Sequence, residues 1–169
     1  HFPRPGVAGN LPSGEAYIVP YEGEKDGDPS RTQGVLPVQF ETDILYYQIQ
    51  GNKAIGVTGS GPRARSEAER VVSEPAYANI AELGLGVLAD FGLEPTGEIL
   101  LDEKLGLHVA FGRSDHFGGQ VGPAQFSSPE AVVHIDRVYL PQTMPDVHPL
   151  SVDLVFADGD KMALMRDNR

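Results

Sequence analysis

Glycine and proline recur at short intervals along this chain and limit it to short secondary-structure elements. The sequence of 169 residues contains 20 Gly and 14 Pro. Proline interrupts helices and interior strands, and glycine favours turns. Such a pattern is typical of short strands joined by turns. We therefore expect a strand-dominated α+β fold, a single domain with one or two main helices.

Two hairpins can be assigned from local patterns. Residues 43–58 carry strand-like segments on both sides of Gly51-Asn52, which predicts a β-hairpin turning at that pair. Residues 152–166 predict a second, terminal hairpin that turns at Asp158-Gly159.

The clearest helix is expected over residues 62–73. Pro62 suits a first helical turn, and Pro75 ends the segment. The apolar residues of one expected face are Ala64, Ala68, Val71 and Val72. A further helical turn is expected around residues 102–107.

Charge and composition exclude several classes of function. The formal net charge is −11, which argues against nucleic acids and anionic membrane surfaces as partners. The chain has no cysteine, so neither disulfides nor thiolate metal sites are available. No apolar run approaches the roughly 18 residues of a membrane span, and no signal-peptide pattern occurs. We expect a cytoplasmic protein.

The chain begins at His1 and continues with a Pro- and Gly-rich stretch. We expect residues 1–9 to be a linker or truncated N-terminal connection, and residues 10–169 to form the domain. An excised domain or processed fragment is the expectation.

His134 and Asp136 are the strongest chemical signal. They lie in the strand-like run 132–140, and residues two apart in a strand point to the same face. An imidazole and a carboxylate side by side form half of a site for a divalent cation. The alternative is a buried histidine with an ordinary hydrogen bond, and Asp136 paired with Arg137.

Three further candidate ligands lie in apolar or Gly-rich surroundings. His108 lies in the apolar strand-like run 106–112, Glu82 in the run 80–86, and Glu15 ends the turn-like segment 10–15. Each also has an ordinary explanation, as a core histidine, an edge residue facing water or a turn residue. Gly84-Leu85-Gly86 lacks the third glycine and following helix of a dinucleotide-binding motif.

In order, these segments resemble the thermophilic leucyl aminopeptidase family (aminopeptidases T and S). The matching runs are Asn10-Leu-Pro-Ser-Gly-Glu15, Ala81-Glu82-Leu-Gly-Leu-Gly86, Leu101-Asp-Glu-Lys-Leu-Gly-Leu-His108-Val-Ala-Phe-Gly112 and Val133-His134-Ile-Asp136. Four motifs in the right order are fairly specific. The resemblance covers the chain from about Asn10 to Tyr139.

The resemblance implies the C-terminal domain of a two-domain metallo-aminopeptidase. Its paired-metal ligands would be Glu15, Glu82, His108, His134 and Asp136, with Glu82 preferred to Glu98. Two divalent ions (zinc, cobalt or manganese) and a peptide substrate are implied. So are a homodimer and an N-terminal domain of the same parent protein that this chain lacks.

The chain departs from the family beside the metal ligands. Where the aminopeptidases carry a tyrosine after the His108 segment, this chain has Asp115-His116-Phe117. We consider His116 a substitute for the missing hydrogen bond or proton, and Glu103 the candidate general base.

Two other functions stay open. His108, His134 and Asp136 also make the two-His-one-carboxylate set of non-haem Fe(II) oxygenases, which suggests a ring-cleaving dioxygenase. A domain that retains metal without catalysis is the third alternative.

Overall fold

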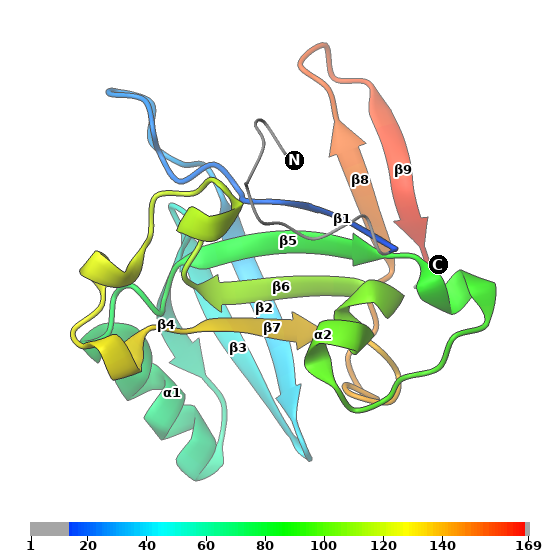
Figure 1. Ribbon diagram of the computed structural model, residues 1–169, viewed down its shortest axis with the longest axis horizontal. Coiled ribbons are helices and arrows are strands. Elements are labelled where there is room, and N and C mark those ends of the chain that lie inside the picture. Colours follow the sequence, from blue (N-terminus) through cyan, green and yellow to red (C-terminus); the bar gives the residue numbers. More distant parts are fainter. Residues whose placement is uncertain (1–13, 168–169) are drawn as a thin grey trace, which may run out of the picture.

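The computed structural model describes residues 14–167, which form two antiparallel sheets and a separate hairpin (Figure 1). The first sheet has the order β1-β5-β6-β7, the second β2-β3-β4, and the ribbon is β8-β9. The strands are β1 Glu15–Ile18, β2 Gln33–Phe40, β3 Asp43–Gln50, β4 Lys53–Thr58, β5 Ile80–Gly86, β6 Leu107–Gly112, β7 His134–Val138, β8 Ser151–Val155 and β9 Lys161–Arg166. The helices are α1 Gly61–Ser73 and the single turn α2 Ile99–Asp102. The expected strand-dominated α+β fold is confirmed.

The core lies between the two sheets and α1. In Figure 1, β2 and β3 pass behind β5, β6 and β7. The buried side chains that join the layers include Val38, Leu45, Tyr47, Tyr77 and Phe111. The rings of Tyr47 and Phe111 have centroids 4.9 Å apart. This packing holds the first sheet rigidly from behind.

Helix α1 begins one residue before its predicted start and ends at the predicted Ser73. Its buried face differs from the prediction: Ala64, Glu67 and Val71 are buried, whereas Val72 is 73% exposed. Glu67 takes the buried position because its carboxylate accepts hydrogen bonds from the hydroxyls of Tyr47 and Tyr77, at 2.7 and 2.6 Å.

Both predicted hairpins form. Strands β3 and β4 turn at Gly51-Asn52, where Asn52 adopts a positive φ of 65°. Strand β2 was not predicted, and Pro37 lies in its middle. Proline is tolerated at this position because β2 is an edge strand of its sheet.

The expected helical turn around residues 102–107 starts earlier. It consists of α2 followed by a 3₁₀ turn, Glu103–Leu105. The carboxylate of Asp102 holds this segment by accepting hydrogen bonds from Thr96 and from the Gly97 amide, at 2.7 to 3.0 Å.

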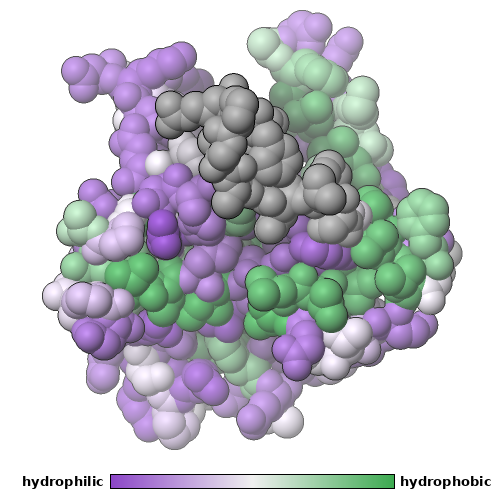
Figure 2. Space-filling view, viewed as in Figure 1, coloured by the Kyte–Doolittle hydropathy of each residue, from purple (hydrophilic) through white to green (hydrophobic). Residues whose placement is uncertain are grey.

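The terminal hairpin β8-β9 projects from the body of the molecule and carries an apolar surface. Figure 2 shows hydrophobic residues gathered along it. The exposed ones are Leu154, Val155, Phe156, Met162 and Leu164.

Among residues 14–167, no helix is long and apolar enough to cross a membrane. The expected linker at residues 1–9 lies outside the described residues.

Candidate metal centre

Four adjacent strands of the first sheet bring the five candidate ligands together. Glu15 is on β1, Glu82 on β5, His108 on β6, and His134 and Asp136 on β7. Across the sheet, Glu82 pairs with Ala110, which in turn pairs with Asp136. Cross-strand partners share a face, so Glu82 and Asp136 lie on one face with only the methyl group of Ala110 between them.

Glu82 links two groups of candidate ligands. Ligand atoms of Glu15, Glu82 and His108 lie within 4.8 Å of one another, and so do those of Glu82, His134 and Asp136. One oxygen of Glu82, Oε1, lies 3.4 Å from His108 Nε2. The other, Oε2, lies 3.2 Å from His134 Nε2. The two oxygens of one carboxylate therefore face two different imidazoles.

Backbone carbonyls orient both imidazole rings. His134 Nδ1 lies 2.7 Å from the Arg113 carbonyl, and His108 Nδ1 lies 3.2 Å from that of Gly106. Donation from Nδ1 to a carbonyl leaves Nε2 turned towards the carboxylates. This is the arrangement in which histidines bind metals, with the second nitrogen held by the protein.

Two glycines make room for this arrangement. Gly84 pairs with His108 across the strands, and a Cβ atom on Gly84 would lie 1.9 Å from His108 Nε2. A Cβ atom on Gly86 would lie 2.2 Å from the main chain of Lys104. The Gly84-Leu85-Gly86 run, which the sequence did not explain, is thus required by the close approach of the ring and of the Glu103–Leu105 turn.

The carboxylates offer unused oxygen atoms, one in each group. Among the described residues, Glu15 Oε2 and Asp136 Oδ1 are buried without a hydrogen-bond partner. Each lies 3.6 Å from the nearest imidazole Nε2, beyond hydrogen-bond range. Unpartnered buried carboxylate oxygens are costly, and a cation offsets that cost. Oxygen and imidazole ligands suit zinc, cobalt or manganese, so the residues present fit divalent ions.

The alternative in which Asp136 pairs with Arg137 is not observed. The Arg137 guanidinium lies over the ring of Phe40, 4.7 Å from its centroid, and its Nη2 lies 3.5 Å from the Tyr77 hydroxyl. As neighbours in β7, Arg137 and Asp136 point to opposite faces of the sheet.

The opposite charges of the cluster shift its pKa values. Burial disfavours ionised Glu82, but hydrogen bonds and charge from His108 and His134 outweigh it and lower the Glu82 pKa to about 2. Burial likewise opposes protonation of His134, but Asp136, Glu82 and the Arg113 carbonyl raise its pKa to about 10. The pKa of His108 is raised against the effect of burial, chiefly by Glu82.

Glu103 and Lys104 lie beside the cluster. Lys104 Nζ donates hydrogen bonds to Glu15 Oε1 and to Glu103 Oε1, both at 2.8 Å. Burial raises the pKa of Glu103, and the charges of Asp136 and Glu15 add to this effect while Lys104 opposes it. The sequence shows no sign of this role for Lys104, because nothing in its spacing signals a partner 89 residues away.

His116 forms part of an aromatic rim over His134. The two rings meet edge-to-face with centroids 4.9 Å apart, and Phe117 lies 5.3 Å from His134. Phe117 also contacts Tyr17, at 4.7 Å between centroids. Burial lowers the pKa of His116, as do the charges of His134 and Arg113. The structure thus brings both expected catalytic residues, Glu103 and His116, to the edge of the cluster.

Glu22 fixes the loop that carries this rim, and sequence reasoning missed it. Its carboxylate accepts hydrogen bonds from Asn79 Nδ2 and Ser114 Oγ, both at 2.7 Å, and from the amide of Gln120.

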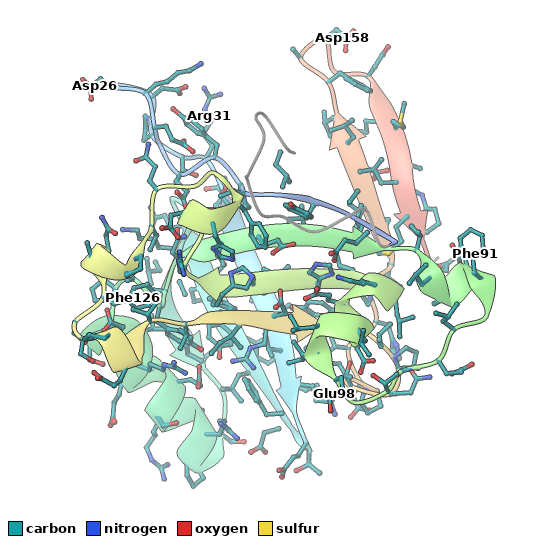
Figure 3. The ribbon with its side chains drawn as sticks, in the orientation of Figure 1. Asp26, Arg31, Phe91, Glu98, Phe126 and Asp158 are labelled. Carbon is teal, nitrogen blue, oxygen red and sulfur yellow. The ribbon has the colours of Figure 1, made fainter. Side chains whose placement is uncertain are left out.

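Glu98, which the sequence offered as the alternative to Glu82, is exposed where α2 begins (Figure 3).

Comparison with solved structures shows a structural likeness to a known protein. No family model matches the sequence, and no curated protein matches it. A solved structure, wild-type AmpT (aminopeptidase T) from Thermus thermophilus, has a similar fold, with a TM-score of 0.58 and 20% sequence identity. The match covers 95% of this chain and 40% of that chain, so the chain spans less than half the length of its structural neighbour.

Proposed function

We propose that this chain is the metal-binding domain of a metallo-aminopeptidase, which hydrolyses N-terminal residues from peptides at a site for two divalent ions. The observation that carries the proposal is the sharing of Glu82 between two ligand groups. The fold similarity to part of an aminopeptidase supports it. Zinc, cobalt or manganese would be held by Glu15, Glu82 and His108 in one group and by Glu82, His134 and Asp136 in the other.

The residues around the cluster have distinct roles in this proposal. Bound divalent ions supply a water of lowered pKa and polarise the scissile carbonyl. Glu103 takes a proton from the attacking water, and its raised pKa suits a carboxyl that exchanges protons. His116, at the exposed rim, holds or donates a proton where the family has a tyrosine. The remaining part of the parent protein and a second copy of the chain complete the substrate cavity.

The paired arrangement also weighs against the oxygenase alternative. A mononuclear iron site would need His108, His134 and Asp136 around one point. In the structure, His108 belongs to one ligand group, and His134 and Asp136 belong to the other. Oxygen uptake by the Fe(II)-loaded protein with a dihydroxylated aromatic would favour the oxygenase instead.

Elemental mass spectrometry on protein purified without added metal or chelator tests the metal site. We expect two zinc, cobalt or manganese ions per chain, and loss of metal retention in His134→Ala and in Asp136→Ala. Full stoichiometric binding in both variants would reject the site.

Release of amino acids from amino-acyl substrates by the metal-loaded protein then tests the chemistry. The parent protein serves as the comparison for the isolated domain. Two bound ions without hydrolysis in either would indicate a domain that keeps its metals without catalysis.

A further inference from the structure

Lys104 makes two contacts at the edge of the proposed metal centre. Its Nζ lies 2.8 Å from one oxygen of Glu15 and 2.8 Å from one oxygen of Glu103. The side chain is largely buried, with 15% of its surface exposed. A lysine so placed has lost most of its rotamer freedom, so its ammonium group is a fixed donor to both carboxylates.

The main chain around Lys104 is anchored on both sides. Ahead of it, the buried Asp102 caps residues 96–97. After it, Leu105 is buried, and the Gly106 carbonyl accepts a hydrogen bond from the Gly86 amide at 2.9 Å. Because Gly86 has no side chain, the turn lies directly against the end of β5. The ammonium group therefore approaches Glu15 from a fixed direction.

This contact makes the two oxygens of Glu15 unequal. Oε1 accepts the hydrogen bond from Lys104, whereas Oε2 is buried without a partner and lies 3.6 Å from His108 Nε2. An oxygen that already accepts a charge-assisted hydrogen bond is a poorer metal ligand than its free neighbour. Only Oε2 is left for an ion between Glu15, Glu82 and His108.

We propose that Lys104 is a positioning residue of the metal centre: it makes Glu15 a ligand through one oxygen and keeps Glu103 off the metal as a free carboxylate. The inference rests on the metal site proposed above, but not on peptidase activity. It assigns a function to a residue of the Glu103–Leu105 turn that belongs to neither ligand group.

Charge and positioning predict opposite effects of removing Lys104. A cation beside the site repels a divalent ion, so charge alone would make binding tighter once Lys104 is neutralised. Positioning predicts weaker binding, because Glu15 and Glu103 would be free to rotate. Loss of groups that orient metal ligands costs roughly 10–100-fold in metal affinity.

The test is a Co²⁺ titration of the metal-free protein, followed by calorimetry and by visible absorption, which reports the coordination of cobalt. For Lys104→Met we expect at least one of the two ions to bind ~10–100-fold more weakly, with a changed cobalt spectrum. Lys104→Arg, which keeps a donor, should restore part of the loss. Lys161→Met removes an exposed lysine on β9 and should match wild type. Equal or tighter binding in Lys104→Met, or an unchanged spectrum, would overturn the proposal.

A second measurement needs no variant and covers the case in which Lys104→Met does not fold. In a crystal structure of the metal-loaded wild type, we expect one Glu15 oxygen on the ion and the other on Lys104. Both Glu15 oxygens on the ion, or Glu103 bound to it, would overturn the proposal. Two ions bound in this way without peptide hydrolysis would reject only the proposed function. A wild type that takes up no metal would reject both.

Discussion

The charges of Glu82 and His134 depend on each other. The imidazolium stabilises the carboxylate, and the carboxylate stabilises the imidazolium, at 3.2 Å. The metal-free fold therefore derives stability from both ionised forms. A metal ion replaces this pairing, because it binds the neutral imidazole. The free energy of unfolding should therefore fall as pH rises above 6.5 in the metal-free protein, but not in the metal-bound protein.

For the chelated protein, we expect maximal stability between pH 4.5 and 6.5, the ordinary pKa values of Glu82 and His134. The raised pKa of His134 contributes stability that is complete below 6.5 and is lost as pH rises towards about 10. The lowered pKa of Glu82 contributes stability that is complete above 4.5 and is lost as pH falls towards about 2. Thermal unfolding in excess chelator across this range measures both effects.

Added metal should cancel the loss of stability that the metal-free protein shows at alkaline pH. Protons compete with the ion for the imidazoles, so stabilisation by metal should grow as pH rises above 6.5. His148→Gln, which changes an exposed histidine, is the control and should behave as wild type in both series. A chelated protein whose stability rises between pH 6.5 and 10 would contradict the pairing.

At the level of single residues, the sequence identifies ligand types but not their supports. His134 and Asp136 could be placed on one face because a strand alternates. Lys104 and Glu22 could not be recognised, since each makes its contacts with a segment far along the chain. The carbonyls that orient the histidines belong to Gly106 and Arg113, whose side chains carry no signal of that role.

At the level of elements, the packing of β6 against β5 at the metal centre depends on Gly84, because the His108 ring lies where a side chain would be. Gly84→Ala would place a methyl group 1.9 Å from His108 Nε2, so the ring must move away from Glu15 and Glu82. We expect at least ~10-fold weaker binding of metal, as for loss of groups that orient a ligand. Gly56→Ala in β4, where a Cβ atom meets nothing within 4 Å, is the matched control. Calorimetric titration of both variants decides the matter: equal affinities would show that His108 is not held over Gly84.

Helix α1 is held to the second sheet through a buried carboxylate. Removal of Glu67 leaves the hydroxyls of Tyr47 and Tyr77 without their acceptor. We expect Glu67→Ala to lower the free energy of unfolding by roughly 3 kcal/mol, because buried unpaired donors cost about 1–3 kcal/mol each. Glu67→Gln keeps an acceptor and should cost less. Urea unfolding provides the measurement, with the exposed Glu69→Ala as control; equal losses for Ala at 67 and 69 would contradict this role.

Some helices and strands could be predicted from local sequence signals, and others could not. The hairpin at Gly51-Asn52 and the helix between Pro62 and Pro75 carry their own turn and end signals. Strand β1 does not, because it is short and Glu15 follows directly on a segment typical of turns. Glu67 could not be assigned to the buried face, since its partners come from β3 and from the segment before β5.

At the level of the whole molecule, the order of strands in the first sheet, β1-β5-β6-β7, could not be predicted from the sequence. Strand β1 pairs with β5, and the three strands between them form a separate sheet. This crossover brings Glu15 beside Glu82 and His108. Periodicity can predict each strand separately, but the choice of neighbours depends on packing between sheets. The ligand set was therefore assembled from family resemblance, and the arrangement of Glu82 between two groups became visible only in the fold.

The number of bound ions should appear in the stability of the whole molecule. Ions that bind only the folded state add about 1.4 kcal/mol to the free energy of unfolding per tenfold rise in free metal, for each ion bound. Two ligand groups sharing Glu82 predict a slope of about 2.7 kcal/mol per tenfold rise, and a single ion predicts half of this. Urea unfolding in zinc buffers of increasing free concentration measures the slope directly. Because His134→Ala removes a ligand beside the shared carboxylate, its slope should fall towards zero if the two ions depend on one another. A slope near 1.4 kcal/mol in the wild type would mean that Glu82 serves one ion, and the paired site would have to be abandoned.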